Sequence, residues 1–295
     1  MKNYSIKDFN DRFPSEDACL EWLRQHRFPK MIECPVCKQP RNFYRVKGRK
    51  AYQCDRCRYQ ISPTAGTILH KSPTPLRSWF YAAFLMAQTR TGISAKQLER
   101  ELKVTYKTAW RMFTQIRKLM SENVNPLTGQ VEVDETYIGG KASGKRGRGA
   151  SGKSVVLGMV ERNGNAIATV VPDVKAKTLI PLIEKQVAKE GKTVVFTDEL
   201  SSYNGVERLG YDHEIVQHAA KQYVAGNAHV NTVEALWSTI KRGIDGVNHH
   251  VSPLYLQSYL DSYIYRYDHR KDETPMFASL LDRLSVVQQV QARGW

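Results

Sequence analysis

The segment VEVDETYIGG, residues 131–140, decides how this chain folds. Its β-branched and aromatic residues predict a β-strand. A buried strand normally carries valine or isoleucine, yet this one contains three acids, Glu132, Asp134 and Glu135. Carboxylates are costly to bury without partners, so their presence in a strand needs a chemical reason.

The segments that follow predict the rest of a sheet. SVVLGMVER (154–162) and AIATVVPD (166–173) have the pattern of two further strands, and the helical AKTLIPLIEKQVAKEG (176–191) leads to the strand TVVFTDE (193–199). Three meandering strands, a helix and another strand are the opening of an RNase H-like fold. We therefore expect an α/β domain with a mixed sheet and flanking helices.

Two acids of this sheet are expected to share a metal site. Asp134 lies in the first strand and Asp198 at the end of the fourth, and these strands are neighbours in an RNase H-like order. Ionised carboxylates this close repel each other unless a cation lies between them, and hard divalent ions prefer oxygen ligands. Glu135 and Glu199 each follow one of these acids, so strand alternation should turn them away from the site.

A third acid is expected from the helical segment NTVEALWSTIKRG, residues 231–243. At 100° per residue its apolar side chains form one stripe, which should face the core. Three polar residues lie along the border of that stripe: Asn231, Glu234 and Lys241. Taken alone, Glu234 would be an ordinary exposed glutamate of a helix surface.

Four cysteines near the N-terminus predict a zinc ribbon. In CPVCKQPRNFYRVKGRKAYQCDRC, residues 34–57, two C-x-x-C pairs are separated by sixteen residues, a spacing typical of structural zinc sites. A region this small needs the metal in order to fold. The expected ligands of one Zn²⁺ are Cys34, Cys37, Cys54 and Cys57.

Helical periodicity between residues 71 and 125 predicts a helix-turn-helix. Its second and third helices are separated by a very short turn. On the third helix, Lys107 and Arg111 lie opposite the apolar stripe and are expected to contact DNA. A solvated helix face is the alternative explanation for these charges.

The composition favours a polyanionic partner. Lys and Arg outnumber Asp and Glu by 44 to 29, giving a formal net charge of +15. The segment GGKASGKRGRGASGK, residues 139–153, has nothing to bury, and its basic residues are expected to bind phosphates: Lys141, Lys145, Arg146 and Arg148. No apolar run predicts a membrane helix or a signal peptide, which favours an intracellular, cytoplasmic protein.

The motifs together resemble the DDE transposases of bacterial insertion sequences, and more narrowly the ISXO-two-like group. The resemblance is carried by VDETYIGGK, FTDELSSYNG, HVNTVEALWSTIKRGIDGVNHH and YLDSYIYRYDHR, together with the zinc ribbon. It implies a metal-binding triad of Asp134, Asp198 and Glu234. It also implies a basic residue near the DNA end, which is Lys241 here.

Further site residues follow from the same resemblance. Some members of the group have Asn as the third ligand, so Asn231 is a rival or auxiliary ligand. Arg242, beside Lys241, is a further candidate for contact with DNA. His249 and His250 in DGVNHH are candidates for phosphate contact or for packing beside the helix.

The predicted organisation is an N-terminal helix (1–30), a zinc ribbon (31–70), a helix-turn-helix domain (71–125) and an RNase H-like catalytic domain with C-terminal helices (126–295). The resemblance implies cleavage and strand transfer at terminal inverted repeats and target DNA, with two Mg²⁺ ions, for which Mn²⁺ can substitute. At least a homodimer on DNA is expected. The alternatives are a catalytically silent DNA-binding regulator and an RNase H-like nuclease without strand transfer.

Overall fold

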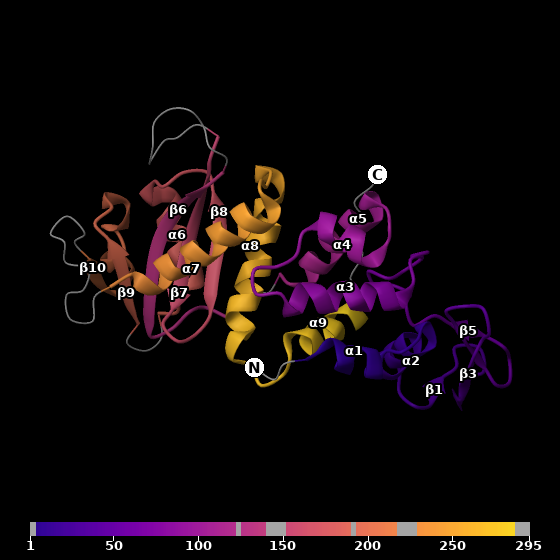
Figure 1. Cartoon of the computed structure of the whole chain (residues 1–295). Coiled ribbons are helices and arrows are strands. Elements are labelled where there is room, and N and C mark those ends of the chain that lie inside the picture. The colour runs from indigo at the N-terminus through magenta and orange to yellow at the C-terminus, as the bar shows by residue number, and fades with distance from the viewer. Residues whose placement is uncertain (1–3, 122–124, 140–151, 190–192, 217–228, 287–295) are drawn as a thin grey trace. The chain divides into compact units, whose positions relative to one another are not determined.

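The computed structural model describes residues 4–121, 125–139, 152–189, 193–216 and 229–286 (Figure 1). Contacts between residues divide the chain into two compact units. Unit 1 comprises the described residues within 1–89, 95–119 and 272–295, and unit 2 those within 90–94 and 120–271. Nowhere in the described parts is there a helix with the length and apolarity needed to cross a bilayer.

Unit 2 is built on a five-stranded sheet with the order β10-β9-β6-β7-β8. Its strands are β6 (Gln130–Ile138), β7 (Ser154–Glu161), β8 (Ala166–Val171), β9 (Val194–Asp198) and β10 (Asp212–Val216). β6 is parallel to β9 and antiparallel to β7, and the outer pairs are β9 with β10, parallel, and β7 with β8, antiparallel. Only β7 therefore runs against the other four, and the predicted mixed α/β sheet is confirmed.

Helices cover both faces of this sheet (Figure 1). The helical elements of unit 2 are α6 (Ala176–Gln186), η1 (Ser201–Tyr203), η2 (Glu207–Leu209), α7 (Asn231–Gly243), the π-helix η4 (Ile244–Asn248), α8 (Pro253–Asp268) and η5 (His269–Lys271). The side chains of Val131 and Val133 on β6 share a core with α6. Glu132 and Asp134 point to the opposite face and bond to α7. Alternation along β6 therefore separates an apolar core from a polar interface.

The edge strand β8 is covered by side chains of α8. The Gln257 amide accepts a hydrogen bond from the Val170 N–H and donates one to the Ala168 carbonyl, both at 2.9 Å. At the other end of the strand, Asp268 accepts from the Ala166 N–H at 2.8 Å. These side chains thus bond to backbone N–H and C=O groups of β8 that could otherwise pair with a further strand.

A glycine allows α7 to approach the sheet closely. Gly158 on β7 lies directly opposite Asp134 on β6. A Cβ atom built on Gly158 would overlap the indole ring of Trp237. The missing side chain therefore creates the space in which Trp237 packs beside Asp134.

Unit 1 combines short strands with helices. The strands are β1 (Ile32–Glu33), β2 (Pro40–Arg41), β3 (Phe43–Arg45), β4 (Tyr52–Cys54) and β5 (Gln60–Ile61), of which β3 and β4 form an antiparallel hairpin. The helices are α1 (Ile6–Arg12), α2 (Glu16–Arg27), α3 (Leu76–Gln88), α4 (Ala95–Leu102), α5 (Tyr106–Leu119) and α9 (Met276–Ser285). The turn between α4 and α5 is short, and Lys103 in it has a φ of 51°.

Helix α9 belongs to unit 1 by its contacts, whereas the predicted organisation groups the C-terminal helices with the catalytic domain. The reason is aromatic packing. The ring of Phe277 lies 5.9 Å from that of Phe9, 6.2 Å from Phe13 and 5.5 Å from Phe84, between ring centroids. Because Phe277 is fully buried in this cluster, it stabilises the packing of α9 in unit 1. The four-domain division remains a prediction.

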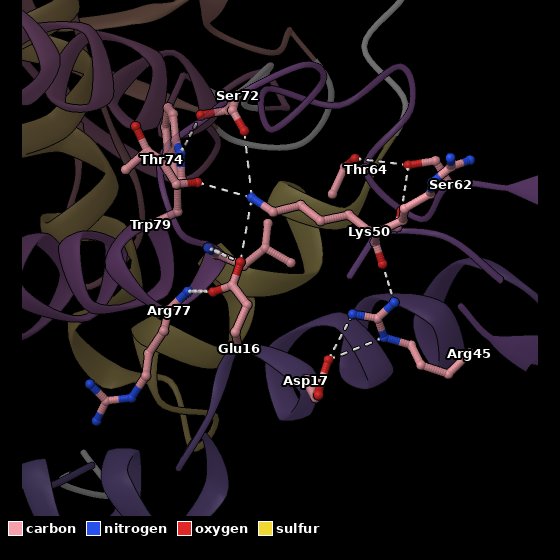
Figure 2. A network of polar contacts seen from close by, with 12 residues as sticks. Glu16, Asp17, Arg45, Lys50, Ser62, Thr64, Ser72, Thr74, Arg77 and Trp79 are labelled. Atoms are coloured by element: carbon pink, nitrogen blue, oxygen red, sulfur yellow. Dashed lines mark hydrogen bonds and ion pairs between the residues drawn. The ribbon is translucent and has the colours of Figure 1, made fainter. Parts of the chain in front are cut away.

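A polar network ties the zinc-ribbon region to the helices of unit 1 (Figure 2). Glu16 on α2 accepts hydrogen bonds from the backbone N–H groups of Leu76, at 2.8 Å, and Arg77, at 3.1 Å, at the start of α3. Lys50, from the β3–β4 turn, lies 3.4 Å from the Glu16 carboxylate and donates to the carbonyl of Thr74 at 3.1 Å. One glutamate thus caps a helix of another segment, and a ribbon lysine holds it there.

Replacing Gly158 by Ala is expected to destabilise unit 2 by about 1–3 kcal/mol, because the new methyl group forces the Trp237 indole out of its place. Denaturant unfolding followed by circular dichroism measures the change. Gly246→Ala is the matched control, since a Cβ there meets nothing within 4 Å. Equal stabilities for the two variants would contradict the close packing of α7 on β7.

Candidate active site and zinc centre

Two similar turns bring the four cysteines of unit 1 together. Cys34 accepts a hydrogen bond from the N–H of Lys38 at 2.8 Å, and Cys54 accepts from Arg58 at 3.3 Å, in each case through the backbone carbonyl. Lys38 and Arg58, each directly after the second cysteine of a pair, have φ values of 56° and 64°. These left-handed residues fold each C-x-x-C segment into a tight turn that aims two thiols at one point.

The sulfur positions fit a zinc ion. One sulfur from each of the four cysteines lies within 4.8 Å of the others. The Sγ atoms of Cys34 and Cys57 are 3.4 Å apart, and those of Cys37 and Cys54 are 4.0 Å apart. Tetrahedral ligands at the usual Zn–S distance are about 3.8 Å from one another, so the donor set matches Zn²⁺.

Three carboxylates converge at the sheet of unit 2. Oxygen atoms of Asp134, Glu135 and Asp198 lie within 4.8 Å of one another. Asp134 and Asp198 are neighbours because β6 pairs with β9 as far as Glu132 and Phe196, and both acids stand two residues further on. This approach was predicted from the sequence.

Glu135 departs from the prediction made by strand alternation. The β6–β9 pairing ends at Glu132, before Glu135 is reached, so the strands leave room for its side chain to approach Asp198. The Tyr203 hydroxyl donates to the Glu135 carboxylate at 2.8 Å and fixes its direction. Glu199 is exposed and lies outside the group, as expected.

The carboxylate group is electrostatically strained without a cation. Burial, together with the negative charges of Glu135 and Asp198, raises the pKa of Asp134 to about 7, while the hydrogen bond from Trp237 acts in the opposite direction. A divalent cation would remove the repulsion. The oxygen-only donor set fits Mg²⁺ or Mn²⁺ and not a thiolate-preferring metal.

Helix α7 lies beside this group. The Trp237 Nε1–H donates to Asp134 Oδ2 at 2.9 Å. Lys241, one turn further on, is exposed; partial desolvation lowers its pKa and the charge of Asp134 raises it. Glu234 precedes Trp237 by three residues and shares its side of the helix, but the three-carboxylate group does not include Glu234.

The remaining predicted site residues have varied surroundings. Asn231 is exposed at the first position of α7, and Arg242 is exposed and donates to the Ser238 carbonyl at 3.2 Å. His249 and His250 are exposed after the π-helix, and neither belongs to a potential metal-ligand group among the described residues. Lys141, Lys145, Arg146 and Arg148 lie outside the described residues.

The two predicted DNA contacts on α5 differ from each other. Lys107 is exposed to solvent. The Arg111 guanidinium donates to Ser72 Oγ at 3.0 Å and lies 5.6 Å from the centre of the Trp79 ring. Arg111 therefore also holds α5 against the start of α3. The role of α4 and α5 as a DNA-binding helix-turn-helix remains a prediction.

Two family models match the segments that contain the carboxylate group and the four cysteines. Residues 126–268 match the family model described as "ISXO2-like transposase domain", which is the ISXO-two-like group named above, and residues 14–60 match "Transposase zinc-ribbon domain". Residues 126–268 are therefore similar to the ISXO2-like transposase domain. The chain pairs this segment with one that is similar to the transposase zinc ribbon.

Similar proteins and structures are also found. An "Uncharacterized protein in transposable element ISH50" from Halobacterium salinarum is 29% identical over 250 residues, covering 78% of this chain and 83% of the relative. An "Uncharacterized transposase-like protein" from Haemophilus influenzae is 24% identical over 99 residues, 34% of this chain and 77% of that protein. The crystal structure of a pre-cleavage Mos1 transpososome aligns with a TM-score of 0.28 and 12% identity, over 66% of this chain and 75% of that one.

The zinc centre gives a direct prediction. Atomic emission spectroscopy of the purified protein is expected to find one zinc per chain, and Cys37→Ser is expected to lose it because three thiolates hold the ion more weakly than four. Cys19→Ala is the matched control, since Cys19 is a buried cysteine outside the group. A full zinc content in Cys37→Ser would contradict the assignment.

Proposed function

We propose that this transposase-family chain cleaves and joins DNA at the terminal inverted repeats of an insertion sequence. The observation that carries the proposal is the approach of Asp134, in the middle of β6, and Asp198, at the end of the neighbouring strand β9, with α7 bonded to Asp134. Carboxylates in this arrangement suit a site for divalent cations. The match to the ISXO2-like transposase domain over residues 126–268 supports the same reading.

Each residue has a chemical role in the proposal. Asp134, Asp198 and Glu234 hold the metal, with Asn231 as the rival third ligand. Two Mg²⁺ ions bound there would lower the pKa of an attacking water and stabilise the departing 3′ oxygen. Lys241, within electrostatic reach of Asp134, binds the phosphate backbone of the DNA end beside the metal site. No covalent protein–DNA bond is needed.

Recognition of the DNA end is assigned to unit 1. The zinc ribbon and the α4–α5 pair carry exposed basic residues such as Lys107, and the chain has a formal net charge of +15. Two ends must be joined in transposition, so the active assembly is a dimer or a larger oligomer on DNA. We further propose that the protein works in the bacterial cytoplasm, near the nucleoid, where its DNA substrate would be found.

Removing one carboxylate should abolish cleavage. Asp134→Asn and Asp198→Asn are each expected to slow Mg²⁺-dependent cleavage of a labelled terminal repeat about a hundredfold or more, because several kcal/mol of charge stabilisation are lost. Asp212→Asn, an exposed acid of β10, is the matched control. Glu234→Gln and Asn231→Ala are compared in the same assay, and the larger loss identifies the third ligand.

Three outcomes of that assay distinguish the possible functions. Cleavage followed by joining to a second duplex is the expected result. Cleavage without joining would indicate a nuclease, and binding without cleavage would indicate a regulator. The repeats that flank the reading frame supply the DNA.

DNA recognition by α5 is tested through the salt dependence of binding. Lys107→Ala is expected to weaken binding to the terminal repeat and to reduce the slope of log Kd against log salt by about one, because one phosphate contact is lost. Lys189→Ala is the control, since its ammonium group pairs with Glu184 at 2.7 Å. An unchanged slope in Lys107→Ala would exclude a phosphate contact by this lysine.

A further inference from the structure

Glu132 is a charged residue that the proposed chemistry does not use. It lies on β6 two residues before Asp134, and its side chain is fully buried. A carboxylate removed from water is tolerated only when hydrogen bonds and charges compensate for the lost hydration. The groups around Glu132 therefore show what the residue is for.

Both carboxylate oxygens of Glu132 face the start of α7. Oε2 accepts from the backbone N–H groups of Thr232, at 2.7 Å, and Val233, at 3.0 Å, and Oε1 accepts from the Thr232 hydroxyl at 2.9 Å. The residue before α7, Val230, supplies no side-chain cap. Glu132 thus satisfies N–H groups that a helix leaves free, from a strand one hundred residues away in sequence.

Arg162 and His229 complete the surroundings of Glu132. Arg162, from the turn after β7, donates through Nε to Oε1 at 2.7 Å and through Nη2 to the carbonyl of His229 at 2.8 Å. The His229 Nδ1 atom lies 3.1 Å from Oε1. The segment leading into α7 and its first turn are therefore both held by one carboxylate and its arginine.

A second bond fixes α7 further along the same strand. Trp237 donates to Asp134, so β6 anchors α7 at Glu132 and again at Asp134. Two residues of a strand span about 6.7 Å, and the four to five residues from Thr232 or Val233 to Trp237 span about 6–7.5 Å of helix. The two spacings match, so both bonds form without distortion, and Glu234 lies on the helix between them.

We propose that Glu132 is a positioning residue that sets where α7 presents Glu234 and Lys241 to the carboxylates of Asp134 and Asp198. The inference rests on the proposed function. In this arrangement one strand, β6, carries Asp134 and, through Glu132, also holds the helix that carries Glu234. The first and third acids of the triad are therefore positioned by the same strand. Arg162 takes part as the partner that pairs with the Glu132 carboxylate and holds its orientation.

Glu132→Gln tests the proposal, because the amide keeps the size of the side chain but one of its two acceptor positions becomes a donor. Three quantities are measured: the cleavage rate at saturating DNA, the Mn²⁺ affinity by calorimetry, and hydrogen exchange of the first turns of α7. We expect cleavage at least tenfold slower, Mn²⁺ binding at least fivefold weaker and faster exchange in α7, with the Kd for the DNA end within twofold of the wild type.

Two further variants make the test specific. Glu16→Gln removes a similar cap, on α3 in unit 1, and is expected to leave the Mn²⁺ affinity and the exchange of α7 unchanged, so it controls for the loss of a capping carboxylate as such. Thr232→Val removes only the hydroxyl contact to Glu132. It is expected to shift the same quantities two- to fivefold and serves if Glu132→Gln does not fold.

The outcomes separate the two proposals. If the wild type cleaves and Glu132→Gln, or Thr232→Val in its place, matches it in rate, Mn²⁺ affinity and exchange of α7, the positioning role is wrong. If the wild type does not cleave, the proposed function is wrong, and the calorimetry and exchange data still decide whether Glu132 positions α7. Equal effects of Glu16→Gln on α7 would also contradict the proposal.

Discussion

A carboxylate can be buried only where donors surround it, and this constraint organises the interface between β6 and α7. Glu132 has no access to solvent and is surrounded by backbone N–H groups of α7, a hydroxyl and Arg162. Asp134, on the same face of the strand, receives the Trp237 indole N–H. The helix has few alternatives to this position, because leaving either carboxylate without its donors would be costly.

The two units solve the same local problem in the same way. In unit 1, Glu16 caps α3 from another helix and Lys50 compensates its charge (Figure 2). In unit 2, Glu132 caps α7 from a strand and Arg162 compensates its charge. In both cases the helix start follows a residue without a side-chain cap, Pro75 or Val230. The stability of each helix is thereby tied to the packing of its unit and not to its own sequence.

Much of this architecture could be predicted from local pattern. The helix predicted for residues 231–243 coincides with α7. Asp134 lies close to Asp198, as expected for acids on neighbouring strands of an RNase H-like sheet. The role of Glu132 could not be predicted, since its partners on α7 lie one hundred residues away in the sequence. Trp237 was expected only as part of the apolar stripe of the helix. The periodicity of the sequence does not show that its indole N–H donates to Asp134.

The position of Glu135 differs from the prediction because the pairing between β6 and β9 stops before this residue. Alternation predicted that Glu135 turns away from the metal site, but it fixes only the face on which the side chain starts and not where a long carboxylate side chain ends once the adjacent strand has stopped. Beyond Glu132 the bonds between β6 and β9 end, and Glu135 reaches the other two acids under the direction of Tyr203. Such an end point depends on the length of β9, which the sequence around Glu135 does not encode.

The glutamine and aspartate of α8 that cover β8 also bear on how copies of the chain can meet. Gln257 bonds to Val170 and Ala168 as an added strand would, and Asp268 occupies the N–H of Ala166. A second molecule cannot extend the sheet across this border without first displacing α8. Self-association by edge-to-edge strand addition, the common route from a soluble sheet to an aggregate, is thus blocked on this side by two side chains.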